Sequence, residues 1–214
     1  MKKIKDIKIQ QVELSPRKKP AQRRAEETVA LILETSAQVL VKVGLDDFNT
    51  NMLAEHAGLR VSTVYRYFPN KLAILTALVQ NLRDTIIEAL TSVEVDDDDW
   101  QSVIYAYIDA YVVVNRENSA FFAIRRAIQS SPKLYEIEKE LELKLSSNMA
   151  RLLLEKGVEI RSEDLTRVIQ VFLVAGAAIC DLAYLKGKKD KESEEAIIRE
   201  LKVMSINYLA NYCS

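Results

Sequence analysis

At 214 residues the chain is long enough to bury a sizeable core in one or two domains. Its 49% hydrophobic and 29% charged residues are typical of a soluble globular protein, and only 5 Gly and 4 Pro favour long helices over an all-β fold. The net charge of −1 hides an asymmetry: residues 1–83 hold 14 Lys and Arg against 8 Asp and Glu, whereas residues 84–214 hold 16 against 23. This pattern predicts that only the N-terminal part contacts a polyanion.

Three features argue against a secreted or membrane protein. Cys180 and Cys213 lack the spacing of a metal or redox site, so we expect reduced thiols. The first ten residues are charged throughout, without the apolar segment of a secretory signal. The longest apolar run, Val171–Cys180, has 10 residues and is too short to span a bilayer. We therefore expect a cytoplasmic protein with no membrane partner.

The first elements along the chain are a basic arm and a helix. Residues 1–20 are basic and polar and include two prolines, which favours a flexible arm. Such an arm is either a disordered tail or a segment that touches DNA, as the arms of homeodomains do. Between residues 21 and 43 apolar side chains recur at helical spacing, and Gly44 is expected to end that helix.

Residues 49–71 have the pattern of a helix-turn-helix, in which a glycine turn joins two short helices. Asn49 is placed to cap the first helix with its side-chain oxygen. Gly58 follows where the turn favours a left-handed residue, and Pro69 stops the second helix. Because the second helix of this motif can lie in the major groove, the segment predicts a DNA-binding domain.

The remaining chain predicts an all-α second domain. A long helix from Lys71 to about Val93 is followed by Asp96–Asp99, four adjacent like charges that belong in a solvated linker. Further helices are expected over residues 100–116, 121–129, 132–156, 162–186 and 192–211, and they bring the total to about nine.

Residues 24–80 resemble the tetracycline-repressor (TetR) family of transcriptional regulators without insertion. The matching residues are Gly44, Phe48, Thr50, Leu53-Ala54-Glu55, Ala57-Gly58-Leu59, Thr63 and Val64-Tyr65-Arg66-Tyr67-Phe68-Pro69-Asn70-Lys71. The sequence departs from the family at Arg60, where a Ser usually caps the recognition helix, and at Asn51 and His56, where many relatives carry Arg. The resemblance implies a DNA-binding domain over residues 21–70 and a ligand-binding and dimerisation domain over residues 71–214.

The resemblance also implies which side chains contact a double-stranded, palindromic operator. Ser62, Thr63 and Arg66 would approach bases, and Thr50, Tyr65, Tyr67 and Lys71 would hold phosphates. Arg60 would bond a guanine or neutralise a phosphate, and Val61 could touch a thymine methyl. The alternative is that these are ordinary surface residues of a small helix.

Large side chains in the second domain suit a mostly apolar cavity for a small-molecule effector. The candidate ligand-binding residues are Trp100, Tyr107, Tyr111, Phe122, Arg125, Met149 and Phe172. For each aromatic or Met residue the alternative is simple core packing. Arg125 and Arg126 could instead bind an anionic ligand, although surface exposure is the simpler interpretation for at least one of them.

The TetR resemblance implies a homodimer formed by the last two helices. The small residues Val174–Ala178 would allow close approach of two helices, across the dimer or within one subunit. No catalytic residue, cofactor or metal site is expected, because there is one histidine, His56, and no nucleophile or phosphate-binding motif. The functional expectation is a ligand-responsive repressor, and the alternative is a dimeric interaction protein with a vestigial DNA-binding domain.

Overall fold

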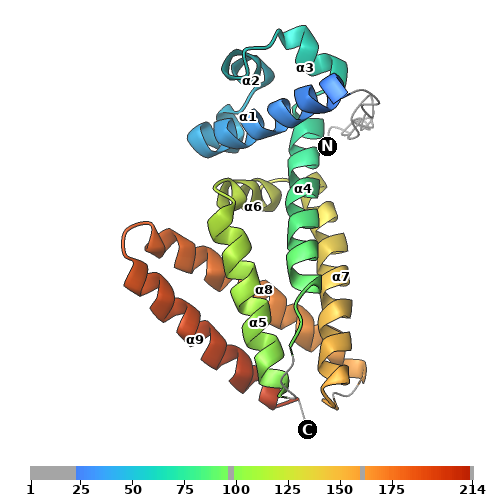
Figure 1. Ribbon diagram of the computed structural model, residues 1–214, viewed down its shortest axis with the longest axis vertical. Coiled ribbons are helices and arrows are strands. Elements are labelled where there is room, and N and C mark those ends of the chain that lie inside the picture. Colours follow the sequence, from blue (N-terminus) through green and yellow to red (C-terminus); the bar gives the residue numbers. More distant parts are fainter. Residues whose placement is uncertain (1–22, 96–98, 160–161, 213–214) are drawn as a thin grey trace, which may run out of the picture. The chain divides into compact units, whose positions relative to one another are not determined.

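The computed structural model describes residues 23–95, 99–159 and 162–212, and over these residues it contains nine α-helices and no strand (Figure 1). The helices are α1 (Arg23–Asp47), α2 (Thr50–His56), α3 (Val61–Tyr67), α4 (Lys71–Thr91), α5 (Trp100–Glu117), α6 (Phe121–Gln129), α7 (Pro132–Glu155), α8 (Ser162–Gly187) and α9 (Lys191–Ala210). The expected all-α fold is confirmed. The predicted basic arm, Asp96–Asp98 and Cys213 lie outside the described residues.

The chain forms two compact units, the first up to Leu78 and the second from Val79 onward. Helix α4 begins in the first unit and continues into the second. The functional boundary between residues 70 and 71 stays a prediction.

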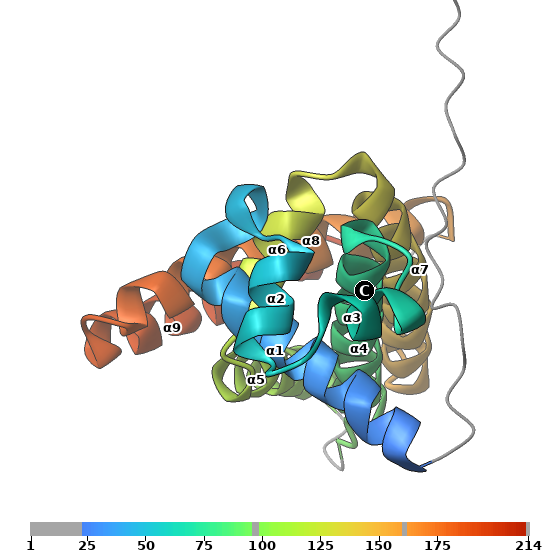
Figure 2. The same cartoon turned by 90° about the horizontal axis from the view of Figure 1, so that it is seen from above.

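The first unit is built from α1, α2, α3 and the first two turns of α4. Helix α1 packs on α2, and α2 packs on α3 (Figure 2). The side chains of Ile32, Leu40, Leu53, Val64 and Phe68 are fully or almost fully buried and form the core.

Helix α1 does not stop cleanly at Gly44, where the sequence predicted its end. Gly44 has a φ of 76°, which interrupts the helix, and a short further turn follows to Asp47. Glycine is the residue that adopts this left-handed conformation without steric cost, so the prediction of a break at Gly44 is confirmed and the last turn is an addition.

The second unit contains the rest of α4 and the helices α5 to α9. Helices α8 and α9 lie side by side and run in opposite directions, joined by a tight turn (Figure 1). The side chains of Ile104, Phe121, Leu134, Met149 and Leu153 are among the largest that are completely buried. They come from α5, α6 and α7, so these helices supply much of the core.

A buried carboxylate fixes the turn between α8 and α9. Glu194 accepts hydrogen bonds from Arg116 Nε at 2.7 Å and from Lys191 Nζ at 3.1 Å. Burial disfavours the ionised carboxyl, but these two cations outweigh it and hold the pKa of Glu194 below its ordinary value. Because Arg116 lies at the end of α5, the pair also ties α5 to α9.

Within the described part of the chain, two helices have the length and mean hydropathy of a membrane-spanning helix: α1 and residues 165–187 of α8. Core helices of soluble proteins meet the same two criteria. In α1, Ile32 and Leu40 are buried in the first unit, and in α8, Val168 and Phe172 are buried in the second. One apolar face of each helix is therefore explained by core packing.

Candidate DNA-binding surface and ligand cavity

The helix-turn-helix has the local geometry that its residues predict. The Asn49 side chain accepts a hydrogen bond of 2.9 Å from the backbone N–H of Met52, which confirms it as the N-cap of α2. Gly58 has a φ of 64° in the turn, as expected for a left-handed residue. The side chain of Arg60 makes no capping hydrogen bond at the start of α3, so the cap of the recognition helix is absent here.

Helix α3 is anchored by one face and leaves the other open. Val64 and Tyr67 are buried, and Phe68 behind them is fully buried, so these residues fix the helix on the core. The opposite face carries six of the nine candidate DNA-contacting side chains, whereas Tyr67, which the sequence assigned to a phosphate, lies on the buried face. Arg60, Ser62, Tyr65 and Arg66 are exposed, and Val61 and Thr63 are half-buried. This open face is polar and basic, which suits contact with base edges and phosphates.

Two of the residues predicted to contact phosphates are hydrogen-bonded to each other. The hydroxyl groups of Thr50 and Tyr65 are 3.0 Å apart and share a hydrogen bond. Thr50 is buried, whereas Tyr65 is 40% exposed. The pair therefore locks α2 against α3 and sets the direction of the Tyr65 ring, while Tyr65 remains accessible to a phosphate.

Lys71 has a structural contact that the sequence did not indicate. Its Nζ donates a hydrogen bond of 2.6 Å to the backbone oxygen of Leu45 and lies 5.7 Å from the centre of the Phe48 ring. Burial lowers its pKa, although Asp46 and Asp47 oppose that shift. The ammonium group therefore secures the last turn of α1 at the start of α4.

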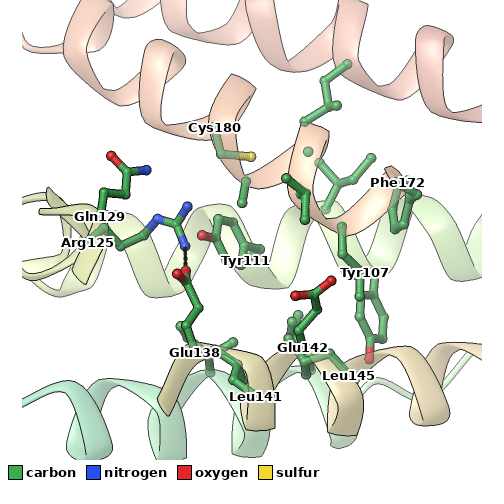
Figure 3. Close-up of a pocket in the computed structure, with 18 of the residues that line it drawn as sticks. Tyr107, Tyr111, Arg125, Gln129, Glu138, Leu141, Glu142, Leu145, Phe172 and Cys180 are labelled. Carbon is green, nitrogen blue, oxygen red and sulfur yellow. Dashed lines mark hydrogen bonds and ion pairs between the residues drawn. The ribbon is translucent and has the colours of Figure 1, made fainter. Parts of the chain in front are cut away.

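The second unit contains a cavity of about 220 Å³ among α4, α5, α6, α7, α8 and α9 (Figure 3). Most of its wall is apolar. Apolar and aromatic side chains on the wall are Ile86, Leu90, Tyr107, Ile108, Tyr111, Tyr135, Leu141, Leu145, Phe172, Leu173, Val174, Ala177, Cys180 and Leu201. The polar wall consists of Arg125, Gln129, Glu138 and Glu142. A mostly apolar cavity with a few convergent polar groups is the usual form of a small-molecule site.

Arg125 is held at one end of the cavity by two carboxylates. Its Nη1 donates to Glu138 Oε1 at 2.8 Å, and its Nε donates to Asp181 Oδ2 at 3.2 Å. All three side chains are at least four-fifths buried. Burial raises the pKa of Glu138 and of Asp181, and Arg125 opposes the shift in both cases.

Other groups near the cavity have no partner among the described residues. The hydroxyl of Tyr111, Oε1 of Glu142 and Oδ1 of Asp181 are buried and make no hydrogen bond to the described part of the protein. Figure 3 shows the Tyr111 hydroxyl pointing toward Arg125 and the Glu142 carboxylate extending from α7 into the lined space. Burial raises the pKa of Tyr111 above its ordinary value and that of Cys180 to about 12, so both groups are neutral at pH 7.

The cavity brings together four of the seven ligand-binding residues proposed from the sequence. Tyr107, Tyr111, Arg125 and Phe172 line it. Trp100, Phe122 and Met149 are not among its lining residues, and Met149 is completely buried in the core. The alternative interpretation of Met149, a side chain that packs in the core and binds no ligand, therefore agrees with its position.

Sequence reasoning missed the acidic side of the cavity. Tyr135, Glu138, Glu142 and Leu145 recur at intervals of three and four on α7 and all reach the wall. That spacing, with two carboxylates inside an otherwise apolar stripe, was the available signal. It was hidden because α7 carries charged residues on several faces.

The described residues contain no group of three or more His, Cys, Asp and Glu side chains placed to hold a metal ion. His56, the one histidine of the sequence, is exposed on α2 and bonds through Nδ1 to the backbone oxygen of Met52 at 2.9 Å. It therefore makes a local helical contact.

An exposed recognition helix on a small helical unit, followed by a larger helical unit with a mostly apolar cavity, defines a helix-turn-helix regulator. Residues 32–78 match the family model of the bacterial regulatory proteins of the tetR family, and residues 98–213 match the tetracyclin repressor-like C-terminal domain. The second match alone covers more than half of the chain, so the protein belongs to the TetR family of transcriptional regulators. Regulators of this family are soluble and generally non-enzymatic DNA-binding proteins.

A curated relative and several solved structures are similar to this chain. The class C tetracycline repressor protein of Escherichia coli is 34% identical over 73 residues, which are 34% of this chain and about a third (32%) of the relative. A transcriptional regulator from Rhodococcus sp. Rha1 has a TM-score of 0.70 at 17% identity, with 86% of this chain and 97% of the other covered.

SmeT of Stenotrophomonas maltophilia, the repressor of the multidrug efflux pump SmeDEF, has a TM-score of 0.65 at 17% identity. The alignment covers 89% of this chain and 92% of SmeT. At these identities the likeness of the solved structures shows a shared fold.

Proposed function

We propose that the protein is a cytoplasmic, ligand-responsive repressor that binds a palindromic operator as a homodimer. The observation that carries this proposal is the double role of α8. On one side Phe172, Ala177 and Cys180 of α8 line the cavity. On another side α8 presents an apolar stripe that nothing in the described chain covers. A ligand and a partner subunit would therefore act on the same helix.

The exposed stripe of α8 has the spacing of a helix–helix seam. Val171, Val174, Ala178, Leu182 and Leu185 are exposed at intervals of three and four residues, and Val174 also reaches the wall of the cavity. Burial of apolar surface stabilises an interface by roughly 25 cal/mol per Å², so packing this stripe against the same stripe of a second chain is favourable. In α9, Val203 and Met204 are also exposed and extend the apolar surface. We infer that α8 and α9 pair with the same helices of a second chain about a two-fold axis.

Gly176 of α8 does not pack tightly against other parts of the subunit. A Cβ added to Gly176 would meet no described atom within 4 Å apart from the helix itself and the chain neighbours. Gly176 instead lines the cavity. The alternative that the small residues serve close helix packing inside one chain is therefore not supported at Gly176.

Two-fold symmetry suits a palindromic DNA site. Paired recognition helices of a dimer meet half-sites about 34–36 Å apart. Helix α4 continues from the DNA-binding unit into the second unit, where Ile86 and Leu90 line the cavity. We infer that an effector shifts α4 and changes the separation of the two α3 helices. Moving the population from mostly bound to mostly released takes about 5.5 kcal/mol of differential effector binding.

Sequence selection from a random pool of double-stranded DNA tests this proposal. The purified protein at physiological salt should enrich a palindrome. Recovery of weak, salt-sensitive binding without sequence preference would contradict an operator-specific repressor and favour an interaction protein with a vestigial DNA-binding domain.

Arg66→Ala should lower operator affinity by about 1–3 kcal/mol and relax sequence preference at one position of each half-site. The guanidinium is exposed on α3 and lies 5.1 Å from the centre of the Tyr67 ring, so it is held near the DNA-facing surface. Fluorescence anisotropy on the selected operator measures the loss. Lys42→Ala, which removes an exposed charge from α1, is the control. Equal affinities for the two variants would remove Arg66 from the base-contacting set.

Lys71→Met should make the dependence of log affinity on log salt shallower by about one unit per subunit, because one phosphate contact is lost. It should also lower the free energy of unfolding by about 1 kcal/mol, since the Leu45 carbonyl loses its charged donor. Titrations at several salt concentrations and urea unfolding measure the two effects separately. A salt dependence equal to that of the wild type, together with lower stability, would show that the Lys71 ammonium group stabilises the end of α1 and contacts no phosphate.

A further inference from the structure

The cavity wall has two carboxylates on the same face of one helix. Glu138 and Glu142 are four residues apart on α7, and both line the cavity. Like charges at this spacing repel each other. The pKa of Glu138 reflects this repulsion, because burial raises it and the nearby charge of Glu142 raises it further. The chain supplies a cation to Glu138 in the form of Arg125, but Oε1 of Glu142 accepts no hydrogen bond from the described residues.

Arg125 does not make this cavity suitable for anions. Its guanidinium already donates to Glu138 and to Asp181, so one positive charge faces two carboxylates before Glu142 is counted. An anionic ligand would have to displace a partly buried carboxylate from Arg125 and would meet Glu142 as well. The interpretation of Arg125 as an anion-binding residue, drawn from the sequence, therefore does not fit its surroundings.

Two polar groups on the cavity wall have no hydrogen-bond partner among the described residues. Oε1 of Glu142 is an acceptor without a donor, and the Tyr111 hydroxyl, which can donate or accept, is also without a partner. Burial of a polar atom without a partner is destabilising, and a ligand that supplies the missing hydrogen bond removes that cost. An ammonium group has three donors and a positive charge, so it satisfies both the hydrogen-bonding and the electrostatic deficit.

We propose that the effector is a small aromatic amine, bound as its ammonium ion with the nitrogen at the Glu142 carboxylate and the ring in the apolar part of the cavity. Aromatic walls favour the same ligand, because Tyr107, Tyr135 and Phe172 surround the space and a cation is attracted to ring faces. The proposal rests on the proposed function, since it names the chemistry of the effector of that repressor.

The volume of the cavity suits a ligand of about one ring and a short chain. An apolar protein cavity of roughly 150 Å³ is large enough for benzene. The volume of about 220 Å³ found here leaves room for a few more heavy atoms. A phenyl ring with a two-carbon arm and an amine has this size, and the 2-phenylethylammonium ion is therefore a suitable probe.

Isothermal titration calorimetry of the full-length protein with three probes tests the proposal. The probes are 2-phenylethylammonium, its uncharged isostere propylbenzene, and the anion phenylacetate. We expect the ammonium ion to bind at least tenfold more tightly than propylbenzene and phenylacetate to bind least. Equal binding of the ammonium ion and propylbenzene, or tighter binding of phenylacetate, would overturn the proposal, and so would the absence of binding by all three.

Glu142→Gln is the informative variant because it keeps the shape of the side chain and removes the charge. Affinity for 2-phenylethylammonium should fall about tenfold or more, whereas affinity for propylbenzene should stay within twofold. Glu136→Gln removes the same charge from an exposed position of α7 and is the matched control, expected to leave both affinities unchanged. The thermal midpoint of unliganded Glu142→Gln should be no lower than that of the wild type, since a repulsion is removed. An equal loss for both probes would show a packing defect and overturn the role of Glu142.

The same probes added to the protein on its selected operator separate this proposal from the proposed function. Enrichment of a palindrome without any response to 2-phenylethylammonium would overturn the amine effector while the DNA-binding function stands. Failure of the selection together with tight, Glu142-dependent amine binding would overturn the repressor and leave the amine site. Release of the operator by the ammonium ion, lost in Glu142→Gln, is the expected result.

Discussion

Leu182→Glu is expected to abolish the dimer and, with it, specific DNA binding. Leu182 is one of the five residues of the exposed stripe of α8 and is 47% exposed in the single chain. In a two-fold interface the substitution would bury an unpaired carboxylate in each subunit, which costs several kcal/mol per ion. A loss of about 4 kcal/mol weakens association roughly a thousandfold. Sedimentation equilibrium should therefore show a monomer, and operator affinity should fall toward the nonspecific level.

Leu143→Glu is the matched control for this experiment. Leu143 is on α7 and is 64% exposed, so the same substitution there introduces the same charge without touching the stripe. It should leave both the dimer and operator affinity as in the wild type. If Leu182→Glu remains a dimer at concentrations where the wild type is one, the pairing of α8 across a two-fold axis is wrong.

Arg125→Met is expected to lower the free energy of unfolding by about 3 kcal/mol at pH 7. The substitution keeps much of the side-chain volume but leaves the carboxylates of Glu138 and Asp181 without their cation. Their side chains are only 20% and 14% exposed, and removing one partner of a buried ion pair typically costs 3–5 kcal/mol. Urea unfolding monitored by circular dichroism measures the loss.

The pH dependence of this loss follows from the direction of the two pKa shifts. Burial already raises the pKa of both carboxyls in the folded protein, and removal of Arg125 raises each pKa further. A raised carboxyl pKa stabilises the fold at pH values below the unfolded pKa, and that contribution is lost as the pH rises through the folded pKa. The loss caused by Arg125→Met should therefore shrink at pH 5 and be larger at pH 8.

Arg126→Met changes the same charge at the adjacent, exposed position and should cost far less. A loss for Arg125→Met that matches this control, or that grows as the pH falls, would contradict the description of Arg125 as the cation of a buried acidic cluster.

The helix-turn-helix could be predicted from the sequence because its determinants are local. The capping oxygen of Asn49 lies three residues from the amide that it accepts, and Gly58 occupies a turn between neighbouring helices. Short-range hydrogen bonds and a single left-handed residue leave a direct trace in the order of residue types. The hydrogen bond between Thr50 and Tyr65 joins two helices and was missed for the opposite reason.

The cavity could be predicted only in part, because its residues come from six helices. Tyr107 and Phe172 were foreseeable as large side chains of a helical domain, and both line it. The ion pairs from Arg125 to Glu138 and to Asp181 join α6 to α7 and α8, and helical periodicity carries no information about such pairings. Glu142 looks like one of many solvated charges of α7 until its neighbours are placed around it.

Scrambling one half-site of the selected operator tests most directly whether two chains bind one palindrome together. Affinities for the intact and the half-scrambled duplex are measured at the same physiological salt. The dimer predicts a loss of at least about a hundredfold, because one of the two recognition helices then contacts nonspecific DNA. Equal affinity for the two duplexes would mean that a single recognition helix suffices, and it would contradict the dimeric repressor.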